Sequence, residues 1–271
     1  MTGIRVSLGI VFYNPTQTDI ARVNKYATCN LFAGIYVYDN SSSSHQKKLS
    51  PLVHYIHCAK NQGLSIPYNR MIEQSIENGS DYLCLLDQDS DFPLKEIKKI
   101  VEAIEKHNEG LTNTAIIAPR IYTRASIKNR NLPRPVFTTV SMAINSGSFL
   151  NMNYIKKHQL RYDENIFLDG VDYDFCWTIS EKKCEVKIYE GSTFVQNLGY
   201  EIAKHPTFNA HSSIRYYYIA HNRKYVYRKH FGWRRGTYKM MRRNLSTFIR
   251  ILRYEENRLS KAIALLRGWL G

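Results

Sequence analysis

The stretch that decides the fold reads Leu83-Cys84-Leu85-Leu86-Asp87-Gln88-Asp89-Ser90-Asp91. Its apolar first half ends abruptly in three acidic residues at alternate positions. A short apolar run before a polar break is typical of a buried strand in a parallel sheet. Open α/β sheets bind ligands beyond the carboxyl ends of such strands. Asp87 and Asp89 therefore predict a divalent cation carrying a diphosphate, because hard cations share oxygen ligands with phosphates. The alternative is an acidic turn that caps the next helix, near Pro93.

Length and composition fit one large globular domain, or one domain with an appendage. The chain has 271 residues, of which 44% are hydrophobic, and its five cysteines include no Cys-x-x-Cys pair. This argues against a disulfide framework and against a structural zinc site. No secretory signal and no apolar run of about 18 residues is present, so we expect no transmembrane helix and a cytoplasmic protein.

Strands and helices alternate over the first 120 residues. We expect strands at 4–12, 34–38, 53–58, 83–86 and 115–118, and helices from Thr18 or Asp19 to residue 30, over 68–77 and over 94–107. This alternation predicts an α/β fold with a Rossmann-like, mostly parallel sheet and helices on both faces. Residues 122–134 read as a loop. Beyond Val140 the pattern is irregular, with a helix expected over 175–181 and a strand over 186–189.

The last fifth of the chain carries nearly all the excess positive charge. From Arg215 onward there are 15 Lys/Arg and 2 Asp/Glu, a net of +13 out of +15 for the whole chain. Apolar residues recur with helical spacing at Leu245, Phe248, Leu252, Leu259, Ile263, Leu266 and Trp269. A basic amphipathic helix of this kind predicts an element on an anionic membrane surface. The alternative is a helix packed on its own domain with a solvated charged face.

A second acidic cluster reads Asp169-Gly170-Val171-Asp172-Tyr173-Asp174. A carboxylate close to other carboxylates can have a raised pKa and act as a general base on a hydroxyl. The alternative is a turn whose Asp172 or Asp174 caps a helix. Both acidic clusters together favour nucleotide-dependent group transfer.

Seven short motifs in a fixed order resemble those of family 2 glycosyltransferases with the GT-A fold, in particular their rhamnosyltransferase-like branch. The resemblance covers about Ile4 to Asn222. Its motifs are Val11–Pro15, Val37–Ser41, Asn61–Ser65 with Asn69, Leu86–Ser90, Asn145–Gly147, Phe167–Cys176 and His211–Tyr217. The Gln-containing form of the Asp-x-Asp element is typical of that branch.

The resemblance implies an inverting, metal-dependent hexosyltransferase. The donor is a dTDP or UDP sugar, possible examples being dTDP-rhamnose or a UDP-hexose. The acceptor is a hydroxyl of a lipid-linked oligosaccharide in bacterial surface polysaccharide or O-antigen synthesis. The general base is assigned to Asp172, with Asp169 second. Donor binding is assigned to Tyr13, Asn14, Asp39, Asn61, Gly63, Asn69, Asp87, Gln88 and Arg215, and the acceptor side to Asn145, Ser146 and Gly147.

The metal, Mn²⁺ or Mg²⁺, is assigned to Asp89 with Asp87 nearby. Gln196 stands where many relatives carry a histidine ligand, so an amide oxygen, or His205 or His211, is expected to take that place. We expect a glycosyltransferase domain over 1–222 and a basic helical tail over 223–271, on the inner face of the cell membrane.

Three other interpretations stay open. A phosphatase of the haloacid dehalogenase type also places Asp-x-Asp after a strand, although normally after the first. The basic, Tyr-rich tail is compatible with a non-catalytic nucleic-acid- or membrane-binding protein. The near-neutral first 214 residues argue against nucleic acid as a partner. A non-catalytic relative that keeps only the fold is the third.

Overall fold

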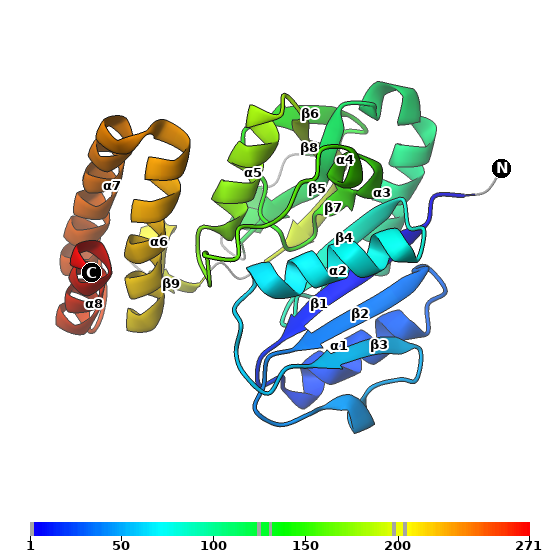
Figure 1. The fold of residues 1–271 in the computed structure, drawn as a ribbon, viewed down its shortest axis with the longest axis horizontal. Helices are drawn as coiled ribbons and strands as arrows, with labels where there is room; N and C mark the ends of the chain where they lie inside the picture. Colours follow the sequence, from blue (N-terminus) through cyan, green and yellow to red (C-terminus); the bar gives the residue numbers. More distant parts are fainter. Residues whose placement is uncertain (1–2, 124–125, 130–131, 197–198, 203–204) are drawn as a thin grey trace. The chain divides into compact units, whose positions relative to one another are not determined.

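The structure is a computed structural model that describes residues 3–123, 126–129, 132–196, 199–202 and 205–271 (Figure 1). It divides into two compact units. Unit 1 comprises Met1–Tyr162 and Phe175–Gln196, and unit 2 comprises Asp163–Asp174 and Asn197–Gly271.

Unit 1 is built on an eight-stranded sheet with the order β3-β2-β1-β4-β7-β5-β8-β6. The pairs β1–β2, β1–β4, β2–β3 and β5–β8 are parallel, whereas β7 and β6 run antiparallel to their neighbours. The predicted mostly parallel sheet is thus confirmed. The strands are β1 (Val6–Phe12), β2 (Gly34–Asp39), β3 (Val53–His57), β4 (Tyr82–Asp87), β5 (Thr114–Tyr122), β6 (Phe137–Val140), β7 (Phe149–Asn151) and β8 (Glu185–Val195).

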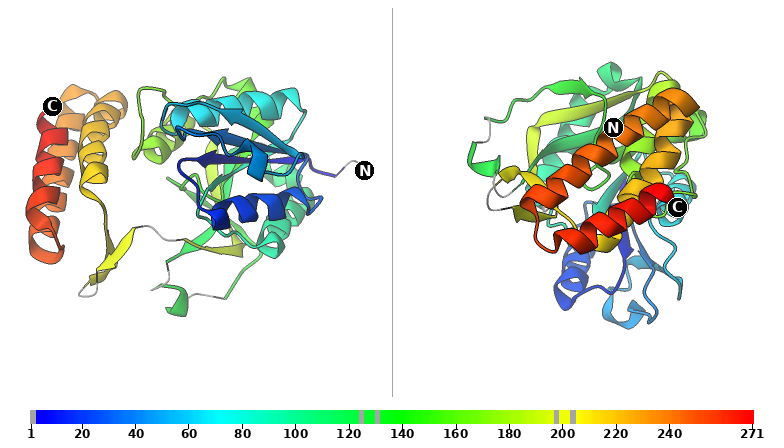
Figure 2. Two further views of the ribbon diagram at one scale, coloured as in Figure 1. Left: turned by 90° about the horizontal axis from the view of Figure 1, so that it is seen from below. Right: turned by 90° about the vertical axis from the view of Figure 1, so that its left-hand side faces the viewer.

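Helices cover both faces of this sheet, as the left view of Figure 2 shows for α1 and α2. Alternate residues of β1, namely Val6, Leu8 and Ile10, belong to one apolar cluster with side chains of α1 and α3. On the other face Gly9 lies against α2, where an added Cβ would stand 2.7 Å from the Met71 sulfur. The helices are α1 (Gln17–Ala27), α2 (Ser65–Glu77), α3 (Leu94–Lys106), α4 (Met152–Lys157) and α5 (Val171–Glu181), of which α5 begins in unit 2.

Several boundaries differ from those expected. Helix α1 is capped by Thr16, not by Thr18 or Asp19, because the Thr16 hydroxyl accepts from the Asp19 N–H while the Asp19 carboxylate accepts from the Thr16 N–H. This reciprocal pair is a capping box, which satisfies two backbone donors at once. Helix α5 begins at Val171 instead of 175, so Asp172 lies in its first turn.

Unit 2 contains the β9 (Tyr200–Ile202) and β10 (His205–Ala210) hairpin and the helices α6 (Ser213–Phe231), α7 (Trp233–Tyr254) and α8 (Arg258–Leu270). Helix α6 packs against both α7 and α8 around Tyr216, Ala220, Ile251, Ala262 and Leu265. The right view of Figure 2 shows α7 and α8 crossing α6.

The prediction of a single amphipathic helix from Leu245 to Trp269 is wrong. The chain leaves the helix after Tyr254, and Asn257 adopts a left-handed φ of 52° before α8 begins. Glu255 at this corner is buried and accepts hydrogen bonds from the Tyr216 hydroxyl at 2.5 Å and Lys261 Nζ at 3.0 Å. The expected boundary between residues 222 and 223 falls inside α6. Within the described ranges, no helix is long and apolar enough to cross a membrane.

Candidate functional site

The carboxyl ends of β1, β2 and β4 meet at one edge of the sheet in unit 1. In their parallel register, Phe12 lies opposite Asp39 and Val11 lies opposite Asp87. The turns that follow these strands therefore leave from the edge where α/β sheets bind ligands. Strand pairing thus brings together three of the sequence motifs, those around Tyr13, Asp39 and Asp87.

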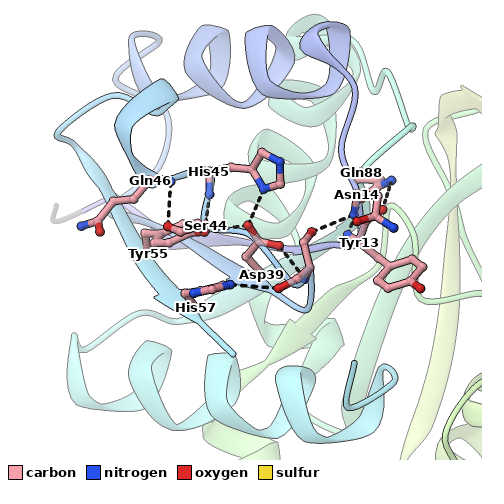
Figure 3. Close-up of polar contacts among 10 residues, drawn as sticks. Tyr13, Asn14, Asp39, Ser44, His45, Gln46, Tyr55, His57 and Gln88 are labelled. Carbon is pink, nitrogen blue, oxygen red and sulfur yellow. Dashed lines mark hydrogen bonds and ion pairs between the residues drawn. The ribbon is translucent and has the colours of Figure 1, made fainter. Parts of the chain in front are cut away.

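Gln88 joins the acidic loop to the turn after β1 (Figure 3). The Tyr13 N–H donates to Gln88 Oε1 at 2.7 Å, and Gln88 Nε2 donates to the Tyr13 carbonyl at 3.2 Å. Arg22 of α1 donates to the Gln88 carbonyl at 2.6 Å. Because both ends of the Gln88 amide engage the Tyr13 backbone, Gln88 positions the Tyr13 ring, which is 52% exposed.

Asp39 is the centre of the polar cluster in Figure 3. Its fully buried carboxylate accepts hydrogen bonds from the Ser41 N–H at 2.9 Å, the Tyr55 hydroxyl at 2.6 Å and His45 Nδ1 at 2.8 Å. Burial alone raises the pKa of Asp39, but these hydrogen bonds outweigh it and hold the pKa below its ordinary value. Asp39 therefore organises the surrounding loop, and its carboxylate is buried.

The turn after β1 is tied to the turn after β2. Asn14 has a left-handed φ of 49°, and its N–H donates to Ser41 Oγ at 2.7 Å. His57 Nε2 lies 2.9 Å from the Ser41 carbonyl oxygen. His45, Tyr55 and His57 were not predicted from the sequence. The available signal was that Tyr55 and His57 alternate along β3 and so share one face.

A third turn completes this edge. The Gly63 N–H donates to Asn61 Oδ1 at 3.0 Å, and Asn40 Nδ2 donates to the Gly63 carbonyl at 2.7 Å. Gly63 has a φ of 74°, which favours glycine. Gly63 thus lies against the turn after β2, and Asn61 is held next to it.

Asp87 is fixed at the end of β4 by two distant residues. Its N–H donates to Ser146 Oγ at 3.1 Å, and its carboxylate accepts from Gln196 Nε2 at 2.8 Å. Gln196 directly follows β8, so the ends of β4 and β8 are linked. Asp89 is exposed two positions further on.

The other atom of the Gln196 amide is an acceptor that lacks a donor. Oε1 is buried and has no hydrogen-bond partner in the part of the chain that the structure describes, and Gln196 as a whole is 8% exposed. The amide cannot be turned round, because two oxygens would then face each other. A buried acceptor left unsatisfied costs about 1–3 kcal/mol, and a bound cation would remove that cost. Asp87, Asp89 and Gln196 supply only oxygen donors, which suit Mg²⁺ or Mn²⁺. Among the described residues, no group of three or more His, Cys, Asp or Glu side chains could hold a metal ion.

The turn of Asn145, Ser146 and Gly147 supports the acidic loop. Ser146 Oγ also lies 2.9 Å from Ser90 Oγ, and the Gly147 N–H donates to the Leu85 carbonyl at 2.7 Å. Gly147 has a φ of 87°, and a Cβ there would stand 3.1 Å from the Phe194 ring. Asn145 and Ser146 are buried, so this turn supports the loop from the interior of unit 1.

Asn69 is buried, and its side chain holds the backbone of Tyr162. It exchanges two hydrogen bonds of 2.9 Å with the backbone N–H and carbonyl of Tyr162, whose hydroxyl donates to Asn145 Oδ1 at 2.8 Å. Asn69 thus belongs to the support of the Asn145 turn and not to an exposed binding surface.

In unit 2, Arg215 of α6 pairs with Asp169. Its guanidinium contacts the two carboxylate oxygens at 2.5 Å and 3.3 Å. Asn222, about two turns further along α6, donates to the Leu168 and Asp169 carbonyls. Asp169 itself has a left-handed φ of 47° and is followed by Gly170 at 101°. Helix α6 therefore fixes the turn that leads into α5.

The segment from Asp163 to Asp174 is also fixed at both of its ends. Lys229 Nζ contacts Asp163 at 2.8 Å and Asp174 at 2.8 Å, and His230 Nε2 lies 2.8 Å from the buried Asp174 carboxylate. Although burial alone raises the pKa of Asp163, hydrogen bonds from Lys229, Tyr225 and the Asn165 N–H lower it to about 2. Asp172 lies between these anchors, in the first turn of α5. Neither Lys229 nor His230 was predicted from the sequence to lie at the site.

His211 carries a neutral imidazole. Burial, and secondly the charge of Arg215, lower the pKa of His211 to about 4. Its Nδ1 is buried and has no hydrogen-bond partner among the described residues. A neutral, unprotonated ring nitrogen is the form that binds metals. The side chain of His205 lies outside the described residues.

Comparison with solved structures defines the class of fold. The chain resembles Staphylococcus aureus TarS 1–349 in complex with UDP-GlcNAc, with a TM-score of 0.55 and 13% identity over 97% of this chain and 80% of that one. It also resembles GalNAc-T7 with UDP, GalNAc and Mn²⁺, with a TM-score of 0.55 and 13% identity over 72% of this chain. The match spans 44% of the GalNAc-T7 chain. The fold is therefore the predicted GT-A α/β fold.

Sequence comparison then gives the family. Residues 15–184 match the model of glycosyl transferase family 2, and the chain belongs to this family. It is 26% identical over 236 residues to the dTDP-rhamnosyl transferase RfbF of Shigella flexneri, which covers 81% of this chain and 79% of the relative. The resemblance to the rhamnosyltransferase-like branch is confirmed, and the protein is a nucleotide-sugar glycosyltransferase.

Proposed function

We propose that this glycosyltransferase inverts the configuration at the anomeric carbon, with Asp172 as the general base. The acceptor oxygen forms a bond to that carbon, the bond to the diphosphate oxygen breaks, and its electron pair leaves with the nucleoside diphosphate. The acceptor proton passes to the Asp172 carboxylate.

The pairing of Asp169 with Arg215 argues against Asp169 as the base, and the resemblance to family 2 glycosyltransferases supports Asp172. A carboxylate whose two oxygens are both engaged by a guanidinium is not available to contact an acceptor hydroxyl. Asp169 is held in this way, at 2.5 Å and 3.3 Å. We therefore assign to Asp169 and Arg215 the positioning of the turn that precedes Asp172, and Arg215 is not assigned to the donor.

The substitution Asp172→Asn tests this assignment. We expect sugar transfer to fall by about 10²–10⁴-fold, while calorimetry shows donor binding unchanged. Glu164→Gln is the matched control, because Glu164 is an exposed carboxylate of the same segment. Full activity in Asp172→Asn would remove Asp172 as the base.

For the donor, we propose dTDP-rhamnose. The relative from S. flexneri is named for this specificity, and the strand edge of unit 1 supplies the binding turns around Tyr13, Asn14, Asn61 and Gly63. Asp39 acts on the nucleoside through His45 and Tyr55, which it orients. The alternative is a UDP-hexose, since one similar structure holds UDP-GlcNAc. A thermal-shift panel of dTDP-rhamnose, UDP-glucose and UDP-GlcNAc, with and without Mn²⁺, separates the two.

We propose that Asp89, Asp87 and Gln196 hold Mg²⁺ or Mn²⁺. When bound, such a cation neutralises the negative charge that develops on the leaving diphosphate. The orphaned Gln196 oxygen and the all-oxygen donor set support this proposal.

We propose a lipid-linked oligosaccharide as the acceptor, in bacterial surface polysaccharide synthesis at the inner face of the cell membrane. The strongly basic tail supports this placement. Transfer to a polyprenyl-diphosphate-linked glycan, compared with the same free glycan, tests it. Equal rates on the two would count against a lipid-linked acceptor.

A further inference from the structure

Helix α7 exposes a line of apolar side chains that none of the described residues of unit 2 covers. Its members recur at spacings of three and four residues and are between 36% and 65% exposed. They are Tyr238, Met241, Leu245, Ile249 and Leu252. We call this line the α7 apolar stripe.

The stripe is distinct from the face by which α7 packs on α6. The packed face consists of Gly236, Met240, Asn244, Thr247 and Ile251, which are buried. At 3.6 residues per turn, the two faces lie roughly 130° apart around the helix. The apolar residues of the tail thus divide between two roles. Phe248 and Trp269, which the sequence pattern placed on the outer face, pack against the core of unit 2 instead.

Exposed arginines follow the stripe along one side. Arg235, Arg242 and Arg253 lie roughly 70° further around the helix and are all exposed. Helix α7 as a whole carries seven Lys/Arg and no Asp/Glu. Helix α8 repeats the combination, with exposed Leu259, Ile263 and Leu270 and three Lys/Arg without an acidic residue.

We propose that the α7 apolar stripe and its arginines bind the surface of a bilayer that contains anionic phospholipid. Such a bilayer offers both an apolar layer for the stripe and negative headgroups for the flanking arginines. Nucleic acid would leave the stripe in contact with water and phosphate. A second copy of the chain would set one helix of charge +7 against another. The proposal deepens the proposed function, because it places the enzyme where a lipid-linked acceptor lies.

Cosedimentation of the full-length protein with vesicles tests this face. We expect binding to phosphatidylcholine vesicles that contain phosphatidylglycerol, weaker binding at high salt, and little binding to phosphatidylcholine alone. Leu245→Gln with Ile249→Gln is expected to lower the affinity more than tenfold. Replacing Arg235, Arg242 and Arg253 by Gln is expected to lower it about fivefold for each arginine.

Matched controls change the same residue types elsewhere. Leu52→Gln with Leu132→Gln alters two exposed leucines of unit 1, and replacing Lys95, Lys98 and Lys106 by Gln removes three exposed charges of α3. Both controls are expected to bind vesicles like the wild type. Unchanged binding by the Leu245/Ile249 variant would overturn the proposal. The proposal would also be overturned if the wild type were a dimer and the Leu245/Ile249 variant a monomer, because the stripe would then be a contact between two copies of the chain. The assay measures no sugar transfer, so a failure of the membrane-binding proposal is distinguishable from a failure of the proposed function.

Discussion

Exchanging the charges of Asp169 and Arg215 separates a positioning role from a catalytic one. The single substitution Arg215→Gln leaves the Asp169 carboxylate, which is 10% exposed, without its bidentate partner. A hydrogen bond to a charged group contributes about 1.5–3 kcal/mol. Because the Arg215 side chain is 42% exposed, water replaces part of the interaction. We therefore expect a loss of about 1–2 kcal/mol in the free energy of unfolding.

The effect on catalysis follows from the turn between Leu168 and Gly170. If the ion pair fixes this turn, its loss displaces Asp172, three residues further on, and kcat falls by about 10–100-fold. The KM for the donor is expected to stay within about twofold. The double variant Asp169→Arg/Arg215→Asp restores the pair with opposite polarity and is expected to recover most of kcat.

A radiolabelled transfer assay with purified enzyme measures kcat and KM for the wild type, Arg215→Gln, the double variant, Asp169→Asn and Asp172→Asn, and thermal unfolding checks their stability. Asp169→Asn is expected to retain at least about a tenth of wild-type kcat, because its amide can still accept from Arg215. The reasoning is refuted if Asp169→Asn is as inactive as Asp172→Asn and the charge exchange recovers nothing, since Asp169 would then be the base.

Three further substitutions test the rest of the site. Gln88→Leu removes both hydrogen bonds to the Tyr13 backbone, about 1 kcal/mol each, and is expected to weaken donor binding about tenfold by calorimetry; unchanged affinity would contradict the positioning role. Gln196→Ala is expected to weaken Mn²⁺ binding at least about tenfold by paramagnetic resonance, whereas an unaltered titration would exclude Gln196 from the metal site. The folded chain keeps His211 neutral down to a pKa of about 4, while the unfolded chain takes up this proton near pH 6.5. The free energy of unfolding is therefore not lowered by His211 above about pH 6.5. As the pH falls from about 6.5 towards 4, it decreases by about 2 kcal/mol, after allowance for the partial exposure of the side chain. The melting temperature of His211→Gln should fall less steeply over this range than that of the wild type; parallel curves would argue against the shift.

The parallel strands were predictable because each is a short apolar run closed by polar residues. Leu83–Asp87 and Val6–Phe12 are examples. Helix ends were less predictable, since Thr16, Thr18 and Asp19 all have capping side chains and only the reciprocal bonds of Thr16 and Asp19 decide among them. The break at Asn257 was missed because the apolar spacing continues across it.

Sequence motifs located the candidate residues but not their partners. The Asp39 carboxylate meets Tyr55 through the pairing of β2 with β3, and Asp169 meets Arg215 across 46 positions. Likewise, α7 buries Asn244 and Thr247 while Leu245 and Ile249 remain exposed. Packing on α6 decides that outcome, and no local pattern in the tail encodes it.

The configuration of the newly formed glycosidic bond tests whether the enzyme inverts the anomeric carbon with Asp172 as the base. Purified enzyme, dTDP-rhamnose and a synthetic lipid-linked acceptor are incubated with Mg²⁺, and the anomeric configuration of the transferred sugar is determined by NMR. We expect transfer with the configuration opposite to that in the donor, and about 10²–10⁴-fold less product from Asp172→Asn. A product with retained configuration, or an Asp172→Asn variant as active as the wild type, would contradict this expectation.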